Sequence, residues 1–221
     1  MSAPTQPIGQ QQLHYFASVT ASVSHELKNV LAILNEHAGL LQDFTAMAAR
    51  GQPLDPDRIR RLSATMLGQI VRGDAIVKRM NRFAHSADRE RATVDLGGLV
   101  TLVVELFGRT AATRGVTVEV RGAEAALRLS TQPFVLETLL GKLLDGLSAA
   151  LPGVGALTIE LHSRAAEAHI RMPGLAQHAA VLSGLLESDD LSTLFAVLQA
   201  NVAFDHGSGE LVITLPGSSD T

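Results

Sequence analysis

The chain has 221 residues, of which 46% are hydrophobic and 18% charged, and its formal net charge is −4. This length suits one large or two small domains with a buried core, and the apolar fraction excludes a largely disordered chain. Because cysteine is absent, disulfide frameworks, zinc fingers and thiol nucleophiles are excluded. Aromatic residues make up only 4%, so the apolar content is Leu, Ala and Val, which favours long helices packed through aliphatic side chains.

The beginning of the chain lacks the features of a targeting segment. Its first residues, MSAPTQPIGQQQ, are polar and have neither the basic nor the apolar region of a signal peptide. The most apolar stretch, residues 96–107, contains Glu105 and is shorter than the roughly 20 residues that span a bilayer. With 18 Lys and Arg against 22 Asp and Glu, the charge balance also disfavours binding to nucleic acid. These features predict a cytoplasmic protein.

The first half of the chain has the pattern of a helical hairpin. Two proline-free stretches, at about residues 10–49 and 58–87, flank the segment GQPLDPD at residues 51–57. The glycine of this segment suits a helix C-cap, and either of its aspartates suits the next N-cap. Two long helices joined by such a turn form an antiparallel hairpin.

A heptad repeat runs along the first of these helices. The positions of its seam are mostly apolar and are spaced alternately three and four residues apart. They are Leu13, Phe16, Thr20, Val23, Leu27, Val30, Leu34, His37, Leu41, Phe44 and Ala48. His37, as a member of this seam, is expected to set helix register. A lone hairpin leaves one side of the seam uncovered, and a second copy would cover it in a dimeric four-helix bundle. The alternative is that the seam packs onto the second half of the same chain.

The second half mixes helical and strand patterns, which predicts an α+β fold with helices on one face of a mixed sheet. Helices are expected at 96–114, 133–150 and 191–200, and strands at 116–120, 156–161, 168–172 and 210–215. The predicted organisation is a disordered tail at 1–8, the hairpin at 9–88, a linker at 89–95, the second domain at 96–217 and a tail at 218–221.

One histidine falls on the outer side of the first helix. If Leu13 is heptad position a, His25 is position f, opposite the seam, and is expected to face solvent. The neighbouring f positions are small, which leaves room for another protein against the helix: Ser18, Ala32 and Gly39. A zinc site of the His-Glu-x-x-His type would need a second histidine where Asn29 stands, and no Gly-x-Ser-x-Gly motif of a hydrolase is found.

The run SHELKNVLAIL at residues 24–34 resembles the H-box of two-component sensor histidine kinases, a His-Glu-hydrophobic-Lys/Arg-Asn/Thr-Pro sequence that carries the phosphorylated histidine. The resemblance covers about residues 10–88 and includes the long helix, the turn and the second helix ending at 82–84. Val30 stands where the family usually has proline, which predicts a straighter first helix without affecting the reactive group.

The resemblance implies a role for several residues around this motif. His25 would accept the phosphoryl group, and Glu26 would hydrogen-bond its ring or take its proton. Asn29 matches the family position that orients water when a receiver is dephosphorylated, although a surface amide without such a role is an equal alternative. The residues expected to contact the partner are Lys28, Ala32 and Gly39.

The second half matches the family's ATP-binding domain in layout but lacks its nucleotide-binding residues. The family holds Mg²⁺ and the phosphates with two helical asparagines, and the matching segment 140–147 has Lys142 and Gly146 in those places. Lys142 is expected to be a solvated helix residue. Segment 172–176 lacks the aspartate that binds adenine, and Gly207-Ser208-Gly209 is expected to be a hairpin turn instead of a phosphate loop. We therefore expect a degenerate GHKL-type α/β sandwich that binds neither ATP nor a metal ion.

Together these features predict a histidine phosphotransferase of a two-component phosphorelay. His25 would accept phosphate from a receiver aspartate and pass it to another receiver, without ATP-dependent autokinase activity. The receiver would supply the Mg²⁺, and the expected partners are response-regulator receivers and a second copy of the chain, with no nucleic acid and no membrane. The alternative is a kinase-like regulator without catalysis, or a receiver phosphatase, that binds a response regulator or a kinase.

Overall fold

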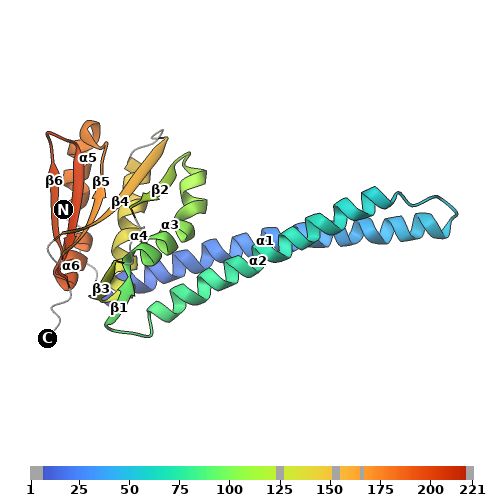
Figure 1. Ribbon diagram of the computed structural model, residues 1–221, viewed down its shortest axis with the longest axis horizontal. Helices are drawn as coiled ribbons and strands as arrows, with labels where there is room; N and C mark the ends of the chain where they lie inside the picture. Colours follow the sequence, from blue (N-terminus) through green and yellow to red (C-terminus); the bar gives the residue numbers. More distant parts are fainter. Residues whose placement is uncertain (1–6, 123–126, 151–154, 165–166, 218–221) are drawn as a thin grey trace. The chain divides into compact units, whose positions relative to one another are not determined.

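The computed structural model describes residues 7–122, 127–150, 155–164 and 167–217, so the predicted tail at 218–221 and most of the tail at 1–8 lie outside the described residues. The chain starts with two long antiparallel helices, α1 (Ile8–Ala49) and α2 (Pro56–Ser86) (Figure 1). The elements that follow are β1 (Ala92–Asp95), α3 (Leu96–Thr113), β2 (Thr117–Arg121), β3 (Arg128–Thr131), α4 (Pro133–Ala150), β4 (Ala156–Arg164), β5 (Glu167–Met172), the 3-10 helix η1 (Ala176–His178), α5 (Ala179–Leu186), α6 (Asp189–Leu198), β6 (Asn201–Asp205) and β7 (Glu210–Leu215). Long helices followed by a sheet-containing domain confirm the predicted α+β class.

Residues 20–82 form one compact unit, in which α1 and α2 pack against each other. The d positions of the predicted heptad supply the contact on α1, since Val23, Val30 and Phe44 are buried, and Leu62 and Ile76 are buried on α2. With valine in place of the family's proline, α1 continues as a single helix through Val30.

The turn between α1 and α2 has the predicted chemistry. Gly51 has φ +82°, a conformation that glycine adopts at a helix C-terminus without steric cost. The Asp55 carboxylate accepts a hydrogen bond from the backbone N–H of Asp57 at 2.9 Å. Asp55 therefore caps α2, which begins at the following proline.

The second compact unit consists of the chain up to Val19 and from Phe83 onward. Its five-stranded sheet has the order β2-β4-β5-β7-β6, with β2 parallel to β4 and the other neighbours antiparallel. Helices α3, α4 and α6 contribute to the same apolar core as the sheet (Figure 1). In β4, Leu157, Ile159 and Leu161 are buried and alternate with more exposed residues, which confirms helices on one face of a mixed sheet.

Three short strands, β1, β3 and β6, were missed in the sequence. β1 lies within the predicted linker at 89–95 and pairs with β3 in a separate antiparallel ribbon, with Ala92 opposite Thr131.

The Gly207-Ser208-Gly209 segment forms the predicted turn between β6 and β7, where the Asp205 carboxylate accepts the Gly207 N–H at 2.8 Å. Hydrogen bonds from Ser208 and Gly207 lower the pKa of Asp205 from its ordinary value.

An aromatic cluster lies within the sheet-bearing unit, between the start of α1, the end of α2 and α4. The Phe83 ring, fully buried, lies 5.5 Å from the Phe16 and Phe134 centroids and 5.6 Å from that of Tyr15. The start of α1 and the end of α2 therefore belong to the same compact unit as the sheet, and the domain boundary that the sequence places at residue 88 stays a prediction. Leu13 lies outside the hairpin unit as well and is 65% exposed in the single chain.

Titration of Tyr15 gives the first testable prediction. Burial, and to a smaller extent the charge of Glu137, raises the pKa of Tyr15 far above its ordinary value of 10. Because the unfolded chain ionises near pH 10 and the folded chain does not, this contribution to stability is complete below pH 10. It is lost by about 1.4 kcal/mol per pH unit as the pH rises toward the folded pKa.

The chain itself supplies the probe for this measurement. Tyr15 is the only tyrosine and tryptophan is absent, so tyrosinate absorbance reports this one side chain. We expect absorbance to rise only as the protein unfolds in alkali, and Tyr15→Phe to remove this part of the alkaline instability. Ionisation near pH 10 in the folded protein would contradict the prediction.

Helix α3 is, among the described residues, long and apolar enough to cross a membrane by length and composition alone. Half of that stretch is buried within the fold, where Leu96, Val100 and Val103 pack in the core. Core helices commonly have the same composition, so this feature is weak evidence for a membrane segment.

Candidate functional site

His25 lies on the exposed surface of α1 in the hairpin unit. Successive residues of an α-helix are about 100° apart, so two residues separate opposite sides of the helix. His25 and Asn29, both exposed, therefore face away from Leu27, which is half-buried. Among the described residues, none forms a hydrogen bond or ion pair with His25. The imidazole has the solvent access that the heptad predicts and that a reaction with another protein requires.

The carboxylate of Glu26 is bound by an arginine of the second helix. Its Oε2 lies 3.4 Å from Nη2 of Arg79, and both side chains are largely shielded, with exposures of 15% and 26%. Shielding from solvent makes this pair stronger than a surface ion pair. It connects α1 to α2 next to His25. The contact between Glu26 and the His25 ring that the resemblance implies stays a prediction.

The other predicted site residues surround His25 without contacting it. Lys28, Asn29 and Ala32 are exposed on α1. Gly39 is partly buried, but a Cβ placed on it would have no atom within 4 Å. This side of α1 is therefore free of bulky side chains at Ala32 and Gly39, as expected of a surface that another protein approaches closely.

The two α4 residues at the family's asparagine positions are covered by the helices that follow. Lys142 Nζ lies 2.6 Å from Oδ2 of Asp190 in α6, so this lysine is paired and partly buried, and the expectation of a solvated residue is wrong. A Cβ on Gly146 would lie 2.6 Å from Cδ1 of Leu185 in α5. The space beside Gly146 is thus occupied by a leucine side chain, and the lysine charge is neutralised within the chain.

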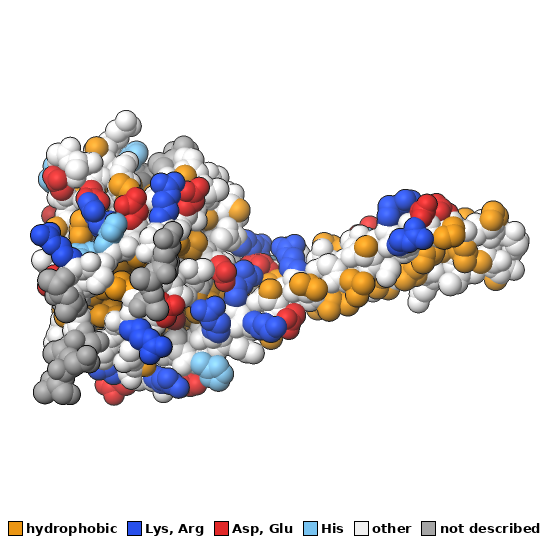
Figure 2. Space-filling view, in the orientation of Figure 1, with side chains coloured by type: hydrophobic (Ala, Val, Ile, Leu, Met, Phe, Trp, Pro, Cys, Tyr) orange, Lys and Arg blue, Asp and Glu red, His pale blue; other side chains and the backbone are white. Residues whose placement is uncertain are grey.

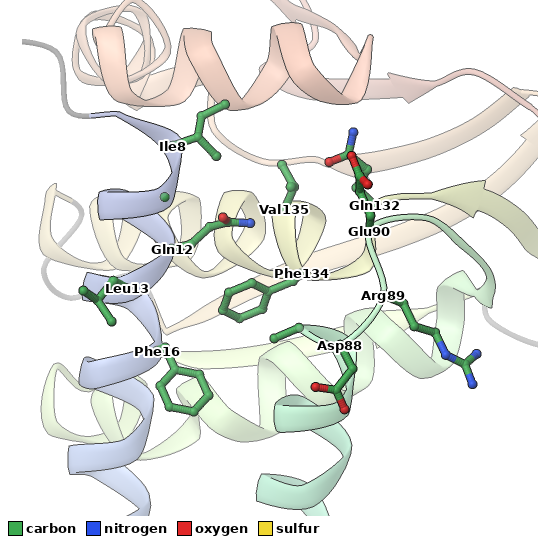
Figure 3. A pocket seen from close by; sticks show the side chains of 12 residues that line it. Ile8, Gln12, Leu13, Phe16, Asp88, Arg89, Glu90, Gln132, Phe134 and Val135 are labelled. Atoms are coloured by element: carbon green, nitrogen blue, oxygen red, sulfur yellow. The ribbon is translucent and has the colours of Figure 1, made fainter.

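A groove of about 660 Å³ in the sheet-bearing unit was not foreseen in the sequence. Its walls are the start of α1, residues 87–90 and the start of α4, with Phe16 and Phe134 on its apolar side (Figure 3). Asp88, Arg89 and Glu90 provide its charged part. None of the predicted site residues lines it. Across the described part of the chain, no three His, Asp or Glu side chains are grouped to hold a metal ion.

Known proteins with a similar sequence or structure are sensor proteins and histidine kinases. No protein-family profile matches the sequence. The chain is 28% identical over 149 residues to the sensor protein CreC of Escherichia coli K12, which covers 66% of this chain and 29% of CreC. The chain thus spans less than a third of the length of this relative.

Solved histidine kinases also resemble the structure. Acinetobacter baumannii histidine kinase AdeS matches with a TM-score of 0.47 at 16% identity, over 89% of this chain and 98% of AdeS. Histidine kinase ThkA, in a complex with the response regulator TrrA, matches with a TM-score of 0.43 at 14% identity, over 95% of this chain and 64% of the ThkA chain.

The order of elements and the sequence similarity to a sensor protein together define a histidine-kinase-like fold, a helical hairpin followed by a GHKL-like domain. The resemblance first seen in the H-box sequence is confirmed at this level. In sequence the chain is similar to a sensor protein over 66% of its own length.

Proposed function

We propose that the chain is a histidine phosphotransferase of a phosphorelay. His25 accepts phosphate from the aspartyl phosphate of one receiver and passes it to a second receiver, and the chain does not phosphorylate itself from ATP. The observation that carries the proposal is the combination of an exposed His25 within an H-box sequence and an α4 helix whose two nucleotide-binding positions are Lys142 and Gly146.

The transfer needs only a neutral imidazole and a correctly placed phosphoryl donor. A ring nitrogen of His25 attacks phosphorus as the bond from phosphorus to the aspartyl oxygen breaks. A nitrogen–phosphorus bond forms, the receiver carboxylate leaves, and the ring proton passes to solvent or to Glu26. Arg79 holds Oε2 of Glu26, so Oε1 is the oxygen available to the imidazole. The receiver supplies the Mg²⁺ that neutralises the phosphoryl oxygens.

The contacts of α4 support the loss of autokinase activity. Phosphoryl transfer from ATP depends on metal ligands and on positioning of the phosphates. Neither lysine nor glycine can replace an asparagine oxygen as a ligand of Mg²⁺. Asp190 pairs with Lys142, and the side chain of Leu185 fills the space beside Gly146. Both features argue against a nucleotide site on this helix.

The exposed apolar side chains of the hairpin support a second copy of the chain as a partner. Figure 2 shows hydrophobic side chains along much of the visible hairpin surface. Large apolar residues of the hairpin unit with exposures of 44% to 69% are Leu31, Leu54, Leu67, Ile70, Val71 and Val77. Exposed apolar side chains of this kind are typical of an interaction surface, and a four-helix bundle would cover them.

Ile70→Asp is expected to convert the dimer to a monomer, because it places a charge within this apolar surface. The matched control is Arg72→Asp, since residue 72 is exposed and lies two positions, about 200°, from Ile70 on α2. Light scattering should show half the molar mass for Ile70→Asp and an unchanged mass for Arg72→Asp. A monomeric wild type would contradict dimerisation through this face.

A non-catalytic regulator or a receiver phosphatase is the second candidate. Asn29 favours the phosphatase, because it is exposed one helical turn from His25, where an amide can orient water on a docked receiver. In either case the receiver docks on the side of α1 that bears His25, against Lys28, Ala32 and Gly39, and the chain acts in the cytoplasm.

Phosphotransfer from charged receivers distinguishes these candidates. Purified receiver domains are phosphorylated with radiolabelled acetyl phosphate, desalted and mixed with the chain. The transferase produces an acid-labile, alkali-stable label on the chain. A phosphatase releases inorganic phosphate without labelling the chain, and a regulator binds the receiver with neither result. Titration with Mg-ATP should give no heat, and tight binding would refute the loss of nucleotide recognition.

A further inference from the structure

A second cavity lies within the hairpin unit, near the turn between its helices. Its volume is about 240 Å³, and it is lined by His37, Leu40 and Phe44 of α1 and by Arg58, Arg61 and Thr65 of α2. The α1 wall is mainly apolar, whereas the α2 wall carries two guanidinium groups. No predicted site residue lies in it, and it is separate from the groove of the sheet-bearing unit.

The Arg58 guanidinium is held in place by an aromatic ring. Its central carbon lies 4.3 Å from the centroid of Phe44, a cation–π contact with a buried phenyl group. Stacking fixes the plane of the guanidinium but leaves its N–H groups able to donate hydrogen bonds. Among the described residues, no carboxylate forms an ion pair with Arg58.

The Arg61 guanidinium is also available for a negative ligand. The nearest carboxylate to Arg61 is that of Asp55, at the limit of ion pairing with 4.0 Å, and both side chains are mainly exposed. The neighbouring Asp57 pairs with Arg60 instead. His37 donates its Nδ1–H to the Ile33 carbonyl at 2.9 Å, which fixes the ring and leaves Nε2 as the free ring nitrogen.

We propose that this cavity binds an anionic oxygen group, a phosphate or a carboxylate, between the Arg58 and Arg61 guanidinium groups. The planar fork of arginine matches the oxygens of both anions. The cavity opens at the first turns of α2, where the helix dipole also favours negative charge. Two guanidinium groups without a strong internal partner therefore have their charge balanced by the ligand.

The two cavity arginines share one side of α2 with Arg79, which contacts Glu26 of α1. Arg58, Arg61, Thr65 and Arg79 follow one another on α2 at spacings of three, four and fourteen residues, which keeps them on one side of the helix. Arg79 of this series pairs with Glu26, the residue next to His25. The ligand can thus be free phosphate or an acidic side chain of a protein docked at His25, about 18 Å along the helix axis. The cavity does not depend on phosphorylation, so this proposal stands even if His25 accepts no phosphate.

Titration with inorganic phosphate tests the site. The ring proton signals of His37, assigned by their loss in His37→Gln, should shift in a saturable manner in wild-type protein. We expect Arg58→Met and Arg61→Met each to weaken binding on the order of tenfold, as for loss of a charged hydrogen bond. Arg60→Met is the matched control, because Arg60 belongs to the same turn of α2 but pairs with Asp57.

The remaining comparisons distinguish the two sources of the anion and show whether a loss of binding is caused by unfolding. Acetate binding as tightly as phosphate supports an acidic side chain as the ligand, and selective phosphate binding supports the free ion. Arg61→Met leaves the Phe44 stacking intact, and His25→Ala is expected to bind like wild type. The absence of a saturable shift, unchanged binding in Arg58→Met/Arg61→Met, or an equal loss in Arg60→Met would overturn the proposal.

Discussion

Replacement of His25 by alanine is expected to abolish phosphate uptake from a charged receiver, with a decrease of roughly a thousandfold or more, because the nucleophile itself is removed. His25 is exposed and bonds to no other described residue, so the variant should keep the stability of the wild type. The measurement is the amount of acid-labile label on the chain after mixing with a radiolabelled phospho-receiver.

Two comparisons make this result specific. His14→Ala is the matched control, because His14 is also exposed on α1 and should leave uptake unchanged. Arg79→Met tests the Glu26 pair: it frees the Glu26 carboxylate, so the rate of uptake should change while the label stays on His25. Equal labelling of wild type and His25→Ala would refute the assignment of the phosphoacceptor and move it to another histidine.

The sequence predicted the hairpin and the position of His25 because both depend on local rules. Helix period and cap chemistry act over a few residues, so the ends of α1 and the turn at Gly51 could be derived without knowledge of the fold. The exposure of His25 follows from the same period. Pro133 likewise marks the start of α4, because proline suits the first turn of a helix.

The elements that were missed depend on partners far away in the chain. β1 and β3 have only four residues each, too few for an alternating pattern, and they form through pairing with each other. Helix α5, with the sequence AAVLSGLL, is apolar almost throughout and has no helical period. Such segments acquire their structure from the tertiary core, so single-sequence patterns did not predict them.

The candidate site, like the fold, has a part that the sequence predicted and a part that it did not. His25 could be identified from its motif, but the Glu26–Arg79 pair joins residues 53 positions apart and depends on the register between two helices. The ion pair of Lys142 with Asp190 could not be predicted for the same reason, since only the folded chain brings the two side chains to 2.6 Å. Charge pairing between distant elements therefore required the structure.

Gly141→Ala is expected to destabilise the sheet-bearing unit, although alanine normally stabilises a helix interior by up to about 1 kcal/mol relative to glycine. A Cβ at residue 141 would lie 2.2 Å from Cε2 of Tyr15 and 2.4 Å from its Cζ. Carbon atoms pack at about 3.5–4.0 Å, so the ring has to move. Phe83, fully buried, lies against Tyr15 in an edge-to-face contact and limits that movement. The expected net cost is about 1–3 kcal/mol.

Urea unfolding measures this cost, and the chain offers a control with the opposite sign. Gly108→Ala in α3 meets no atom within 4 Å of its Cβ, so it should stabilise the protein. Tyr15→Leu should remove most of the clash, so the loss from Gly141→Ala should be smaller in that background, as in a double-mutant cycle. Displacement of the ring also exposes the phenol, and Gly141→Ala should therefore bring the pKa of Tyr15 down toward its ordinary value. A stabilised Gly141→Ala with unchanged tyrosine titration would show that α1 does not pack on α4 at this position.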